Sequence, residues 1–321
     1  MLAFIKNKAL SGKLLIVSIL VLIFLIASSL LFLACSIDGY TDGYTTGETE
    51  NDADGYTDDD AYPDNCTNDE IDKDEIKKNF GNNQYEDHLK KPRVGLYAGK
   101  GSWPENITII ENFLDYYGFS WSVFDEEDAV NLNLIEEFDT IWLAGGFSAE
   151  YKYYIKDHSN IKNFINEGGL FIGTCAGAYY AADVLRWKGT DYEYPLKLFK
   201  GKGIGPMSGL IGWGETSTLK LEGEHPANLG FKPERNIYYF DGPYFKPYDE
   251  EAVTVLARYT VNDQPAVIIG DSGAGHYLLM GPHPEIGDSW EQTAQAEESK
   301  QGAQWPWLYQ LIIWVYNNSD G

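Results

Sequence analysis

The sequence predicts an α/β domain with a doubly wound, mainly parallel sheet, helices on both faces and a β-rich C-terminal half. Three observations support this. Apolar strand-like runs alternate with amphipathic helical runs over residues 93–173, the pattern of βαβ units. A strand, a Gly-rich turn and a helix follow one another over residues 168–179. Short strand-like runs then recur up to residue 280.

The first half of the domain begins with a buried strand at residues 93–98 and a Gly-Lys-Gly turn. Ser102 and Glu105 have capping-box spacing, which predicts the start of a helix that Gly118 ends. The apolar run over residues 140–144 predicts a strand that is covered on both faces. Further elements are predicted as a strand at 121–124 and helices at 125–137 and 160–167.

The second half changes character after a Gly-rich stretch at residues 201–214. Five short runs predict strands that extend the sheet, at 217–221, 236–240, 252–258, 266–269 and 276–280. The apolar run at 305–316 predicts a closing helix that packs against the sheet and is too short to span a membrane.

The turn at Cys175 has the strand–turn–helix pattern of a nucleophile elbow, with Cys in the place of Ser. Gly173 allows the strand to end tightly, and Gly177 allows the next helix to start close to the sheet. The positive end of the helix dipole would favour the thiolate, which is the nucleophile. The alternative is a buried core cysteine.

A second motif supplies the groups that a nucleophilic cysteine needs. His283 and Glu285 follow the last predicted strand, with one Pro between them. His283 can take the thiol proton, and Glu285 can hold the imidazole in the required tautomer. We therefore predict a Cys175–His283–Glu285 triad at the carboxyl ends of the strands.

The elbow followed by His-Pro-Glu resembles the class I glutamine amidotransferase-like superfamily, whose triad is Cys, His and Glu. Several segments are also similar to the family named after the N-terminal domain of biotin–protein ligase, namely 143–146, 173–179, 238–245, 257–259 and 281–285. The resemblance spans residues 92–318. It implies a flavodoxin-like, amidotransferase-like fold, and it makes glutamine the first substrate to test.

The resemblance also implies an oxyanion hole. In that superfamily a Gly-rich loop and the residue after the nucleophile supply its backbone N–H groups, which here implies Gly145, Gly146 and Ala176. Fixed N–H donors stabilise the charge that develops on an acyl oxygen; a plain tight turn at the two glycines is the alternative.

An aromatic-rich run over residues 238–245 surrounds an Asp-Gly-Pro turn. We interpret this run, and within it Tyr239, Asp241 and Gly242, as one wall of the substrate pocket. Packing of these side chains in the core is the alternative interpretation.

Charge is distributed unevenly along the chain. The formal net charge of −25 argues against a nucleic-acid partner. Residues 38–75 alone contain fifteen Asp or Glu and one Lys. Together with its Gly-Tyr-Thr repeats, this composition predicts a disordered acidic linker over residues 36–91. The folded domain is then expected over residues 92–321.

Residues 1–35 decide the predicted location. Three lysines precede residues 14–34, twenty-one residues without a charge, which is long enough to cross a bilayer as a helix. The basic flank predicts that the rest of the chain lies on the extracytoplasmic side of the cell membrane. Phe-Leu-Ala before Cys35 resembles a lipobox, so Cys35 is a candidate for lipidation. An uncleaved anchor and a lipoprotein signal both stay open.

The expected function is that of a membrane-tethered Cys-His-Glu enzyme which cleaves an amide or related acyl bond of a small molecule or peptide through a thioester. The alternative is a non-catalytic module that keeps the fold and binds a ligand. No cofactor is expected, and no metal, since the five histidines form no metal-spaced cluster. The protein partner is not assigned. Three triplets, beginning at Asn65, Asn106 and Asn317, have the spacing of glycosylation acceptors.

Overall fold

The computed structural model describes residues 89–286 and 304–318. The predicted anchor, the lipidation candidate Cys35 and nearly all of the predicted linker lie outside the described residues, so those predictions stay untested. Within the described ranges, no helix has both the length and the apolar character needed to cross a membrane.

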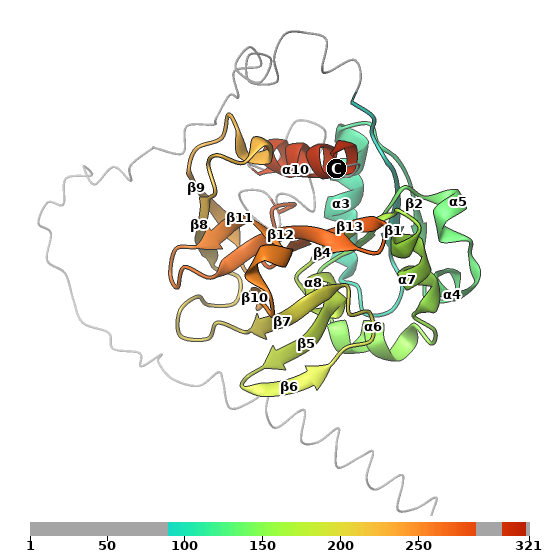
Figure 1. Ribbon diagram of the computed structural model, residues 1–321, viewed down its shortest axis with the longest axis horizontal. Helices are drawn as coiled ribbons and strands as arrows, with labels where there is room; N and C mark the ends of the chain where they lie inside the picture. The colour runs from blue at the N-terminus through green and yellow to red at the C-terminus, as the bar shows by residue number, and fades with distance from the viewer. Residues whose placement is uncertain (1–88, 287–303, 319–321) are drawn as a thin grey trace, which may run out of the picture. The chain divides into compact units, whose positions relative to one another are not determined.

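Within the described residues, nine strands form a mixed sheet in the order β2-β1-β3-β4-β13-β12-β11-β8-β9 (Figure 1). The first five strands in this order pair in parallel, and the remaining pairs are antiparallel. The strands are, in chain order, β1 (Arg93–Tyr97), β2 (Ser120–Phe124), β3 (Thr140–Leu143), β4 (Leu170–Thr174), β8 (Thr216–Leu221), β9 (Glu234–Tyr238), β11 (Thr254–Tyr259), β12 (Pro265–Ser272) and β13 (Gly275–Met280).

An α/β fold is therefore confirmed, whereas a mainly parallel sheet describes only the β2–β13 half. The β-rich C-terminal half forms the antiparallel remainder, because short turns join β11 to β12 and β12 to β13. Short connections of this kind join antiparallel neighbours, and parallel strands need a longer crossover.

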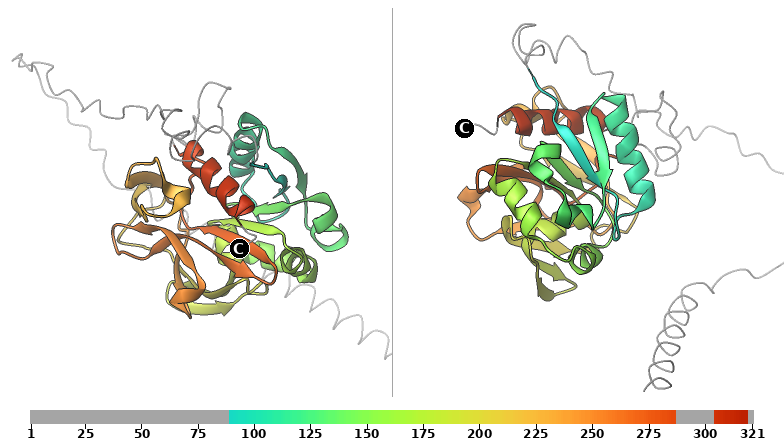
Figure 2. Two further views of the ribbon diagram at one scale, coloured as in Figure 1. Left: turned by 45° about the horizontal axis from the view of Figure 1, so that its top comes forward. Right: turned by 90° about the vertical axis from the view of Figure 1, so that its right-hand side faces the viewer.

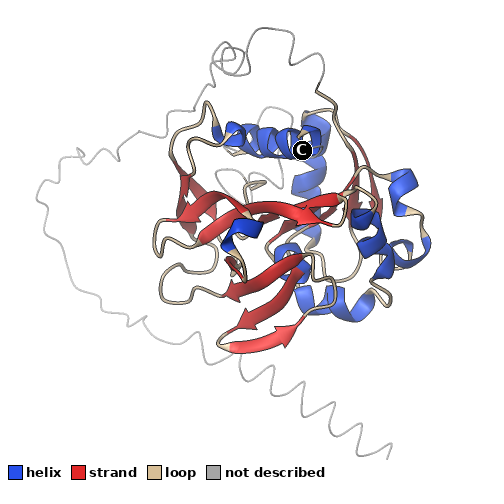
Figure 3. Cartoon of the chain, viewed as in Figure 1, coloured by secondary structure: helices blue, strands red, loops and turns tan. Residues whose placement is uncertain are grey.

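A second, smaller sheet has the order β10-β7-β5-β6 and was not predicted (Figure 3). Its strands are β5 (Ala182–Trp187), β6 (Thr190–Glu193), β7 (Phe199–Gly205) and β10 (Tyr244–Pro247). Strand β7 contains three glycines, which weaken a strand pattern in a sequence. Two of them make room for the ring of Tyr179, since a Cβ on Gly205 would lie 1.9 Å from its hydroxyl oxygen.

Helices pack on the large sheet in two hydrophobic clusters. One cluster contains side chains of α3 and α10, and the other contains side chains of α6, α7 and α8. Neighbouring residues of one strand, such as Ile141 and Trp142, belong to different clusters. This alternation is the period of two along a strand. Both views of Figure 2 show α10 beside α3, where Trp305 meets Phe113 edge-on. The helices are α3 (Pro104–Tyr116), α4 (Asp128–Asn131), α5 (Leu134–Glu137), α6 (Ser148–Tyr154), α7 (Ser159–Asn166), α8 (Ala176–Ala181) and α10 (Trp305–Asn317), with single 3-10 turns η1 (Pro226–Asn228) and η2 (Glu250–Ala252).

Local predictions about helices were right in part. Gly118, with φ of +62°, ends the helix as predicted. The capping box was wrong, because α3 begins at Pro104 and the Ser102 hydroxyl donates to the carbonyl oxygen of Tyr97 at 3.1 Å. The helix expected at 125–137 is two short helices, and α6 was not predicted.

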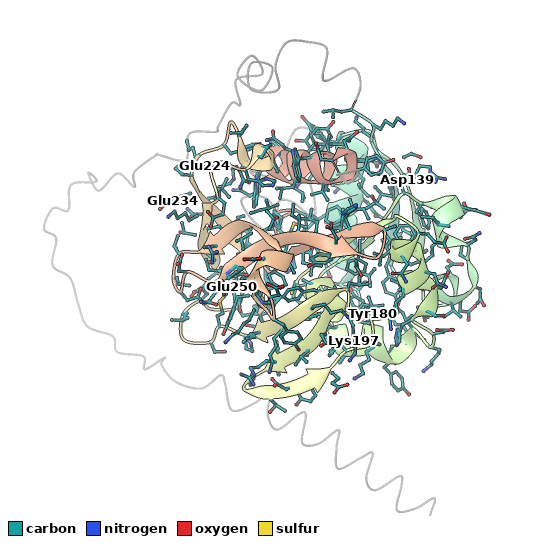
Figure 4. The ribbon with its side chains drawn as sticks, viewed as in Figure 1. Asp139, Tyr180, Lys197, Glu224, Glu234 and Glu250 are labelled. Carbon is teal, nitrogen blue, oxygen red and sulfur yellow. The ribbon has the colours of Figure 1, made fainter. Side chains whose placement is uncertain are left out.

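Polar contacts join the start of the first strand to a distant part of the chain. Asp139, labelled in Figure 4, accepts a hydrogen bond from the backbone N–H of Arg93 at 2.8 Å and pairs with the guanidinium of the same residue at 2.9 Å. These contacts join the start of β1 to the residue before β3. Strands β4 and β13 lie side by side in the middle of the sheet. They are paired in parallel from Leu170 with His276 to Thr174 with Met280.

Candidate active site

Cys175 lies at a sharp corner between β4 and α8. Its φ of 50° and ψ of −100° fall outside the regions that residues other than glycine ordinarily occupy. The neighbouring glycines have the predicted roles. A Cβ on Gly173 would lie 2.8 Å from the carbonyl carbon of Gly177, and a Cβ on Gly177 would lie 1.9 Å from the carbonyl oxygen of Leu143. The chain therefore forms the tight strand–turn–helix corner that its sequence predicts.

Backbone contacts hold the elbow in place. The N–H of Cys175 donates to the carbonyl oxygen of Met280 at 2.8 Å, which joins the elbow to the end of β13. The Sγ atom lies 3.4 Å from the carbonyl oxygen of Phe240 and donates a hydrogen bond to it. Only 5% of Cys175 is exposed, so the residue is almost completely shielded from solvent.

His283 reaches the same end of the sheet because it follows β13, the parallel neighbour of β4. Its backbone N–H donates to the carbonyl oxygen of Tyr238 at 2.9 Å. Its Nδ1 donates to Oε1 of Glu285 at 2.7 Å, and both side chains are fully buried. Glu285 is therefore placed to orient the imidazole, as the sequence predicts.

The electrostatics of His283 link the three predicted triad residues. Burial lowers the pKa of the imidazole, but its interactions with Glu285 and Cys175 more than offset this and raise the pKa to about 10. Glu285 occupies Nδ1, and Nε2 is buried with no hydrogen-bond partner in the described ranges. Nε2 is therefore the ring nitrogen that is left for a proton transfer.

The predicted oxyanion donors differ in their availability. The N–H of Gly145 already donates to Oδ1 of Asn106 at 2.8 Å, so Gly145 is wrong as a donor for an oxyanion. The N–H of Ala176 is the first of α8 and has no acceptor within that helix. The N–H of Gly146 likewise makes no backbone hydrogen bond within the described part of the chain. Gly146 and Ala176 remain the candidate donors.

Asn106 of α3 is a site residue that the sequence analysis missed. The side chain is fully buried; its Nδ2 donates to Oε1 of Glu285 at 2.8 Å while its Oδ1 accepts from Gly145. One side chain thus joins the acid of the triad to the glycine loop. The buried and hydrogen-bonded Asn106 side chain is therefore not accessible as a glycosylation acceptor in the folded protein.

The three residues predicted to form a wall of the substrate pocket make contacts that support the fold. Tyr239 is fully buried, and its hydroxyl accepts from the N–H of Met207 at 2.8 Å, which places it in the core. Asp241 has φ of +60°, its carbonyl oxygen accepts from the Tyr179 hydroxyl at 2.9 Å, and burial raises the pKa of its carboxyl. A Cβ on Gly242 would lie 1.9 Å from the carbonyl oxygen of Gly281. These residues hold the Phe240 carbonyl and the His283 loop in place.

The titration of His283 offers a first test. We expect its imidazole to stay protonated well above the ordinary value of 6.5, and Glu285→Gln to lower its pKa because the carboxylate charge is lost. NMR of the His283 ring against pH measures both. Asp271→Asn is the matched control, since Asp271 pairs at 2.6 Å with another histidine, His276. An unchanged His283 titration in Glu285→Gln would contradict the assignment.

The same shift makes a prediction about stability. A pKa that is raised on folding stabilises the native state fully below about 6.5, and this contribution is lost as the pH rises toward about 10. The difference in unfolding free energy between the wild type and His283→Gln should therefore shrink over that window. Urea unfolding at several pH values measures it, and a difference that grows with pH would refute the prediction.

Asn106→Leu tests the missed residue. The change leaves the buried N–H of Gly145 without a partner, which costs about 1–3 kcal/mol of unfolding free energy, and it removes one of the two donors to Oε1 of Glu285. We expect the His283 titration to change as well, because the Glu285 carboxylate loses the donor that fixes it. Urea unfolding and NMR measure the two effects; Thr108→Val, on the same helix and exposed, is the control. An Asn106→Leu variant with wild-type stability would contradict the bridging role.

Comparisons with known proteins identify a family and several similar chains. A family model described as "Biotin-protein ligase, N terminal" matches residues 135–306, which include Cys175, His283 and Glu285. Biotin–protein ligase of Schizosaccharomyces pombe is 25% identical over 140 residues, which are 40% of this chain and 22% of the ligase. The chain therefore spans about a fifth of that relative's length.

Two further comparisons cover more of the other protein. An uncharacterised protein of Chlamydia muridarum is 26% identical over 219 residues, 61% of this chain and 82% of that protein. Among solved structures, a glutamine amidotransferase is 18% identical and has a TM-score of 0.48, with 70% of this chain and 98% of that chain covered.

Proposed function

Because the chain belongs to the family of the biotin–protein ligase N-terminal domain, we propose that it is a Cys-His-Glu hydrolase or transferase of amide or related acyl bonds. The observation that carries the proposal is the strained Cys175 corner beside a buried His283–Glu285 pair whose imidazole pKa is raised to about 10. Such a pair draws the thiol proton to the ring, which leaves the thiolate as the nucleophile.

The proposed reaction proceeds in two halves. Cys175 Sγ attacks the substrate carbonyl carbon, and the oxygen develops a negative charge beside the Gly146 and Ala176 amides. His283 then gives the proton that it took from the thiol to the leaving amine, so that the C–N bond breaks and a thioester remains. In the second half His283 accepts a proton from water or from an incoming amine, which attacks the thioester and frees Cys175.

Glu285 and Asn106 act without touching the substrate in this scheme. Glu285 keeps Nδ1 of His283 occupied, so that Nε2 is the nitrogen that exchanges protons with Cys175. Asn106 fixes the Oε1 atom that accepts from the imidazole, and it holds the glycine loop at the same time. Both are therefore positioning residues.

Alkylation of Cys175 tests the proposal without knowledge of the substrate. A chloromethyl ketone analogue of glutamine should label the chain once, at Cys175, and His283→Gln should slow the labelling because the thiol loses its base. Peptide mass spectrometry locates the label. If Cys175 reacts no faster than Cys66 with this reagent and with iodoacetamide, the catalytic proposal fails, and a ligand-binding module becomes the better account.

We propose further that residues 1–35 tether the domain to the extracytoplasmic side of the cell membrane, because the uncharged run at 14–34 follows three lysines. The full chain should sediment with membranes and stay there in high salt. Mass spectrometry of the native protein should find either a lipid on an N-terminal Cys35 or an intact Met1. Recovery of the full-length chain in the soluble fraction would contradict both forms of the anchor.

A further inference from the structure

Four aromatic side chains form a connected cluster that begins at the imidazole of His283, and we call them the aromatic rim: Trp103, Phe147, Trp213 and Phe240. The Trp103 ring is stacked with the imidazole at 6.3 Å between centroids, and the Phe240 ring meets it edge-on at 5.2 Å. Trp103 and Phe240 also meet each other edge-on at 5.6 Å. The backbone carbonyl of Phe240 also accepts a hydrogen bond from Cys175 Sγ, so a residue of the rim contacts the proposed nucleophile.

The rim extends from this buried site to the surface. Phe147 and Trp213 meet Trp103 edge-on at 6.5 and 6.2 Å, and Trp213 meets Phe240 at 5.0 Å. Phe147 is 58% exposed and Trp213 is 63% exposed. A chain of rings in contact therefore runs from two exposed side chains to the buried imidazole.

Phe147 and Trp213 are more exposed than the other Phe and Trp side chains of the described residues. Within residues 89–286 and 304–318, Phe147 and Trp213 are the only Phe or Trp side chains that are more than half exposed. The other strongly exposed aromatic side chains are tyrosines, which place a hydroxyl in water, and a lysine covers Tyr153 at 4.2 Å. Exposed apolar surface beside a reactive group is a common mark of a ligand site.

We propose that the aromatic rim binds an apolar group of the substrate, aromatic or aliphatic, which lies next to the scissile carbonyl. This inference rests on the proposed function and names its substrate class: a small-molecule or peptide amide whose side chain next to the scissile carbonyl is apolar, in preference to a polar carboxamide side chain such as that of glutamine. Rings bind such a group by burial and by edge-to-face contact, whereas they leave the carboxamide of a glutamine side chain without hydrogen-bond partners. Substrate binding would also cover Phe147 and Trp213.

Two chloromethyl ketones that differ only in the side chain test the inference, one with the side chain of phenylalanine and one with that of glutamine. We expect the phenylalanine reagent to label wild-type Cys175 about 10-fold faster or more. In Trp213→Ala and Phe147→Ala, the ratio of its rate to that of iodoacetamide should fall by about 10-fold. Tyr153→Ala removes an equally exposed ring elsewhere and is the control, with the wild-type ratio.

Each other outcome has a distinct meaning. Faster labelling by the glutamine reagent, or an unchanged ratio in both rim variants, would overturn the inference and leave the proposed function in place. A change of oligomeric state in Trp213→Ala without a change in the ratio would identify a second copy of the chain as the occupant, and would also overturn it. Failure of every reagent to label Cys175 would defeat the proposed function and the inference together.

Discussion

Cys175→Ala is expected to abolish amide or acyl turnover, with a loss of at least about 10⁴-fold in kcat. The sulfur is the atom at the elbow that can form the covalent intermediate, because Ala176 has no reactive group and the Thr174 hydroxyl is fully buried and accepts a hydrogen bond from Nε1 of Trp142 at 3.1 Å. Binding of a substrate should persist, because the aromatic rim and the backbone donors do not depend on the sulfur. Steady-state kinetics on an amide found with the labelling reagents measures the loss.

The same kinetic experiment shows whether Cys175 and His283 act as one catalytic unit or contribute independently to kcat. His283→Gln alone should cost a similar factor, and the double variant should be no worse than either single one, because residues that act as a unit are not additive. Cys66→Ser, which removes a thiol of the acidic N-terminal segment, is the control and should keep wild-type activity. Turnover that survives in Cys175→Ala would remove Cys175 from the mechanism.

Gly177→Ala is expected to have the largest effect on stability, a loss of about 3 kcal/mol or more of unfolding free energy. The added Cβ would lie 1.9 Å from the carbonyl oxygen of Leu143, and that atom belongs to the backbone of β3, which cannot rotate away. Either α8 moves off the sheet or β3 shifts, and both movements displace Cys175. Urea unfolding measures the loss.

Gly223→Ala is the matched control for this prediction. A Cβ at Gly223 meets no atom within 4 Å, and its φ is not in the left-handed region. This variant should keep the wild-type midpoint or gain slightly, because alanine restricts the unfolded chain. If Gly177→Ala unfolds within about 1 kcal/mol of the wild type, the close packing of α8 on β3 does not control the elbow.

The sequence analysis located the elbow and the His283–Glu285 pair because both are local motifs. A strand, a tight glycine turn and a helix can be recognised from a dozen residues, and the side chains of His283 and Glu285 are separated by one proline. The structure adds the contact that brings them together, the parallel pairing of β4 with β13. Such a pairing between distant segments has no local signal.

Other features depend on contacts that no local pattern reports. Asn106 lies on the buried side of a helix that is otherwise apolar there, and a polar residue on that face is the one signal that could have identified it. The same contact uses the Gly145 amide, which is why this donor was assigned wrongly. The small sheet escaped prediction because Gly203 and Gly205 lie inside β7, where tertiary packing on Tyr179 overrides weak strand propensity.

The central claim, a covalent acyl group on Cys175 formed with the help of His283, can be tested directly. The protein is mixed with an activated ester such as p-nitrophenyl acetate and quenched in acid, and its peptides are weighed by mass spectrometry. We predict one acetyl group on the peptide that contains Cys175, removed by hydroxylamine and much slower to form in His283→Gln. An acetyl group absent from Cys175, or formed at the same rate in His283→Gln, would contradict the account.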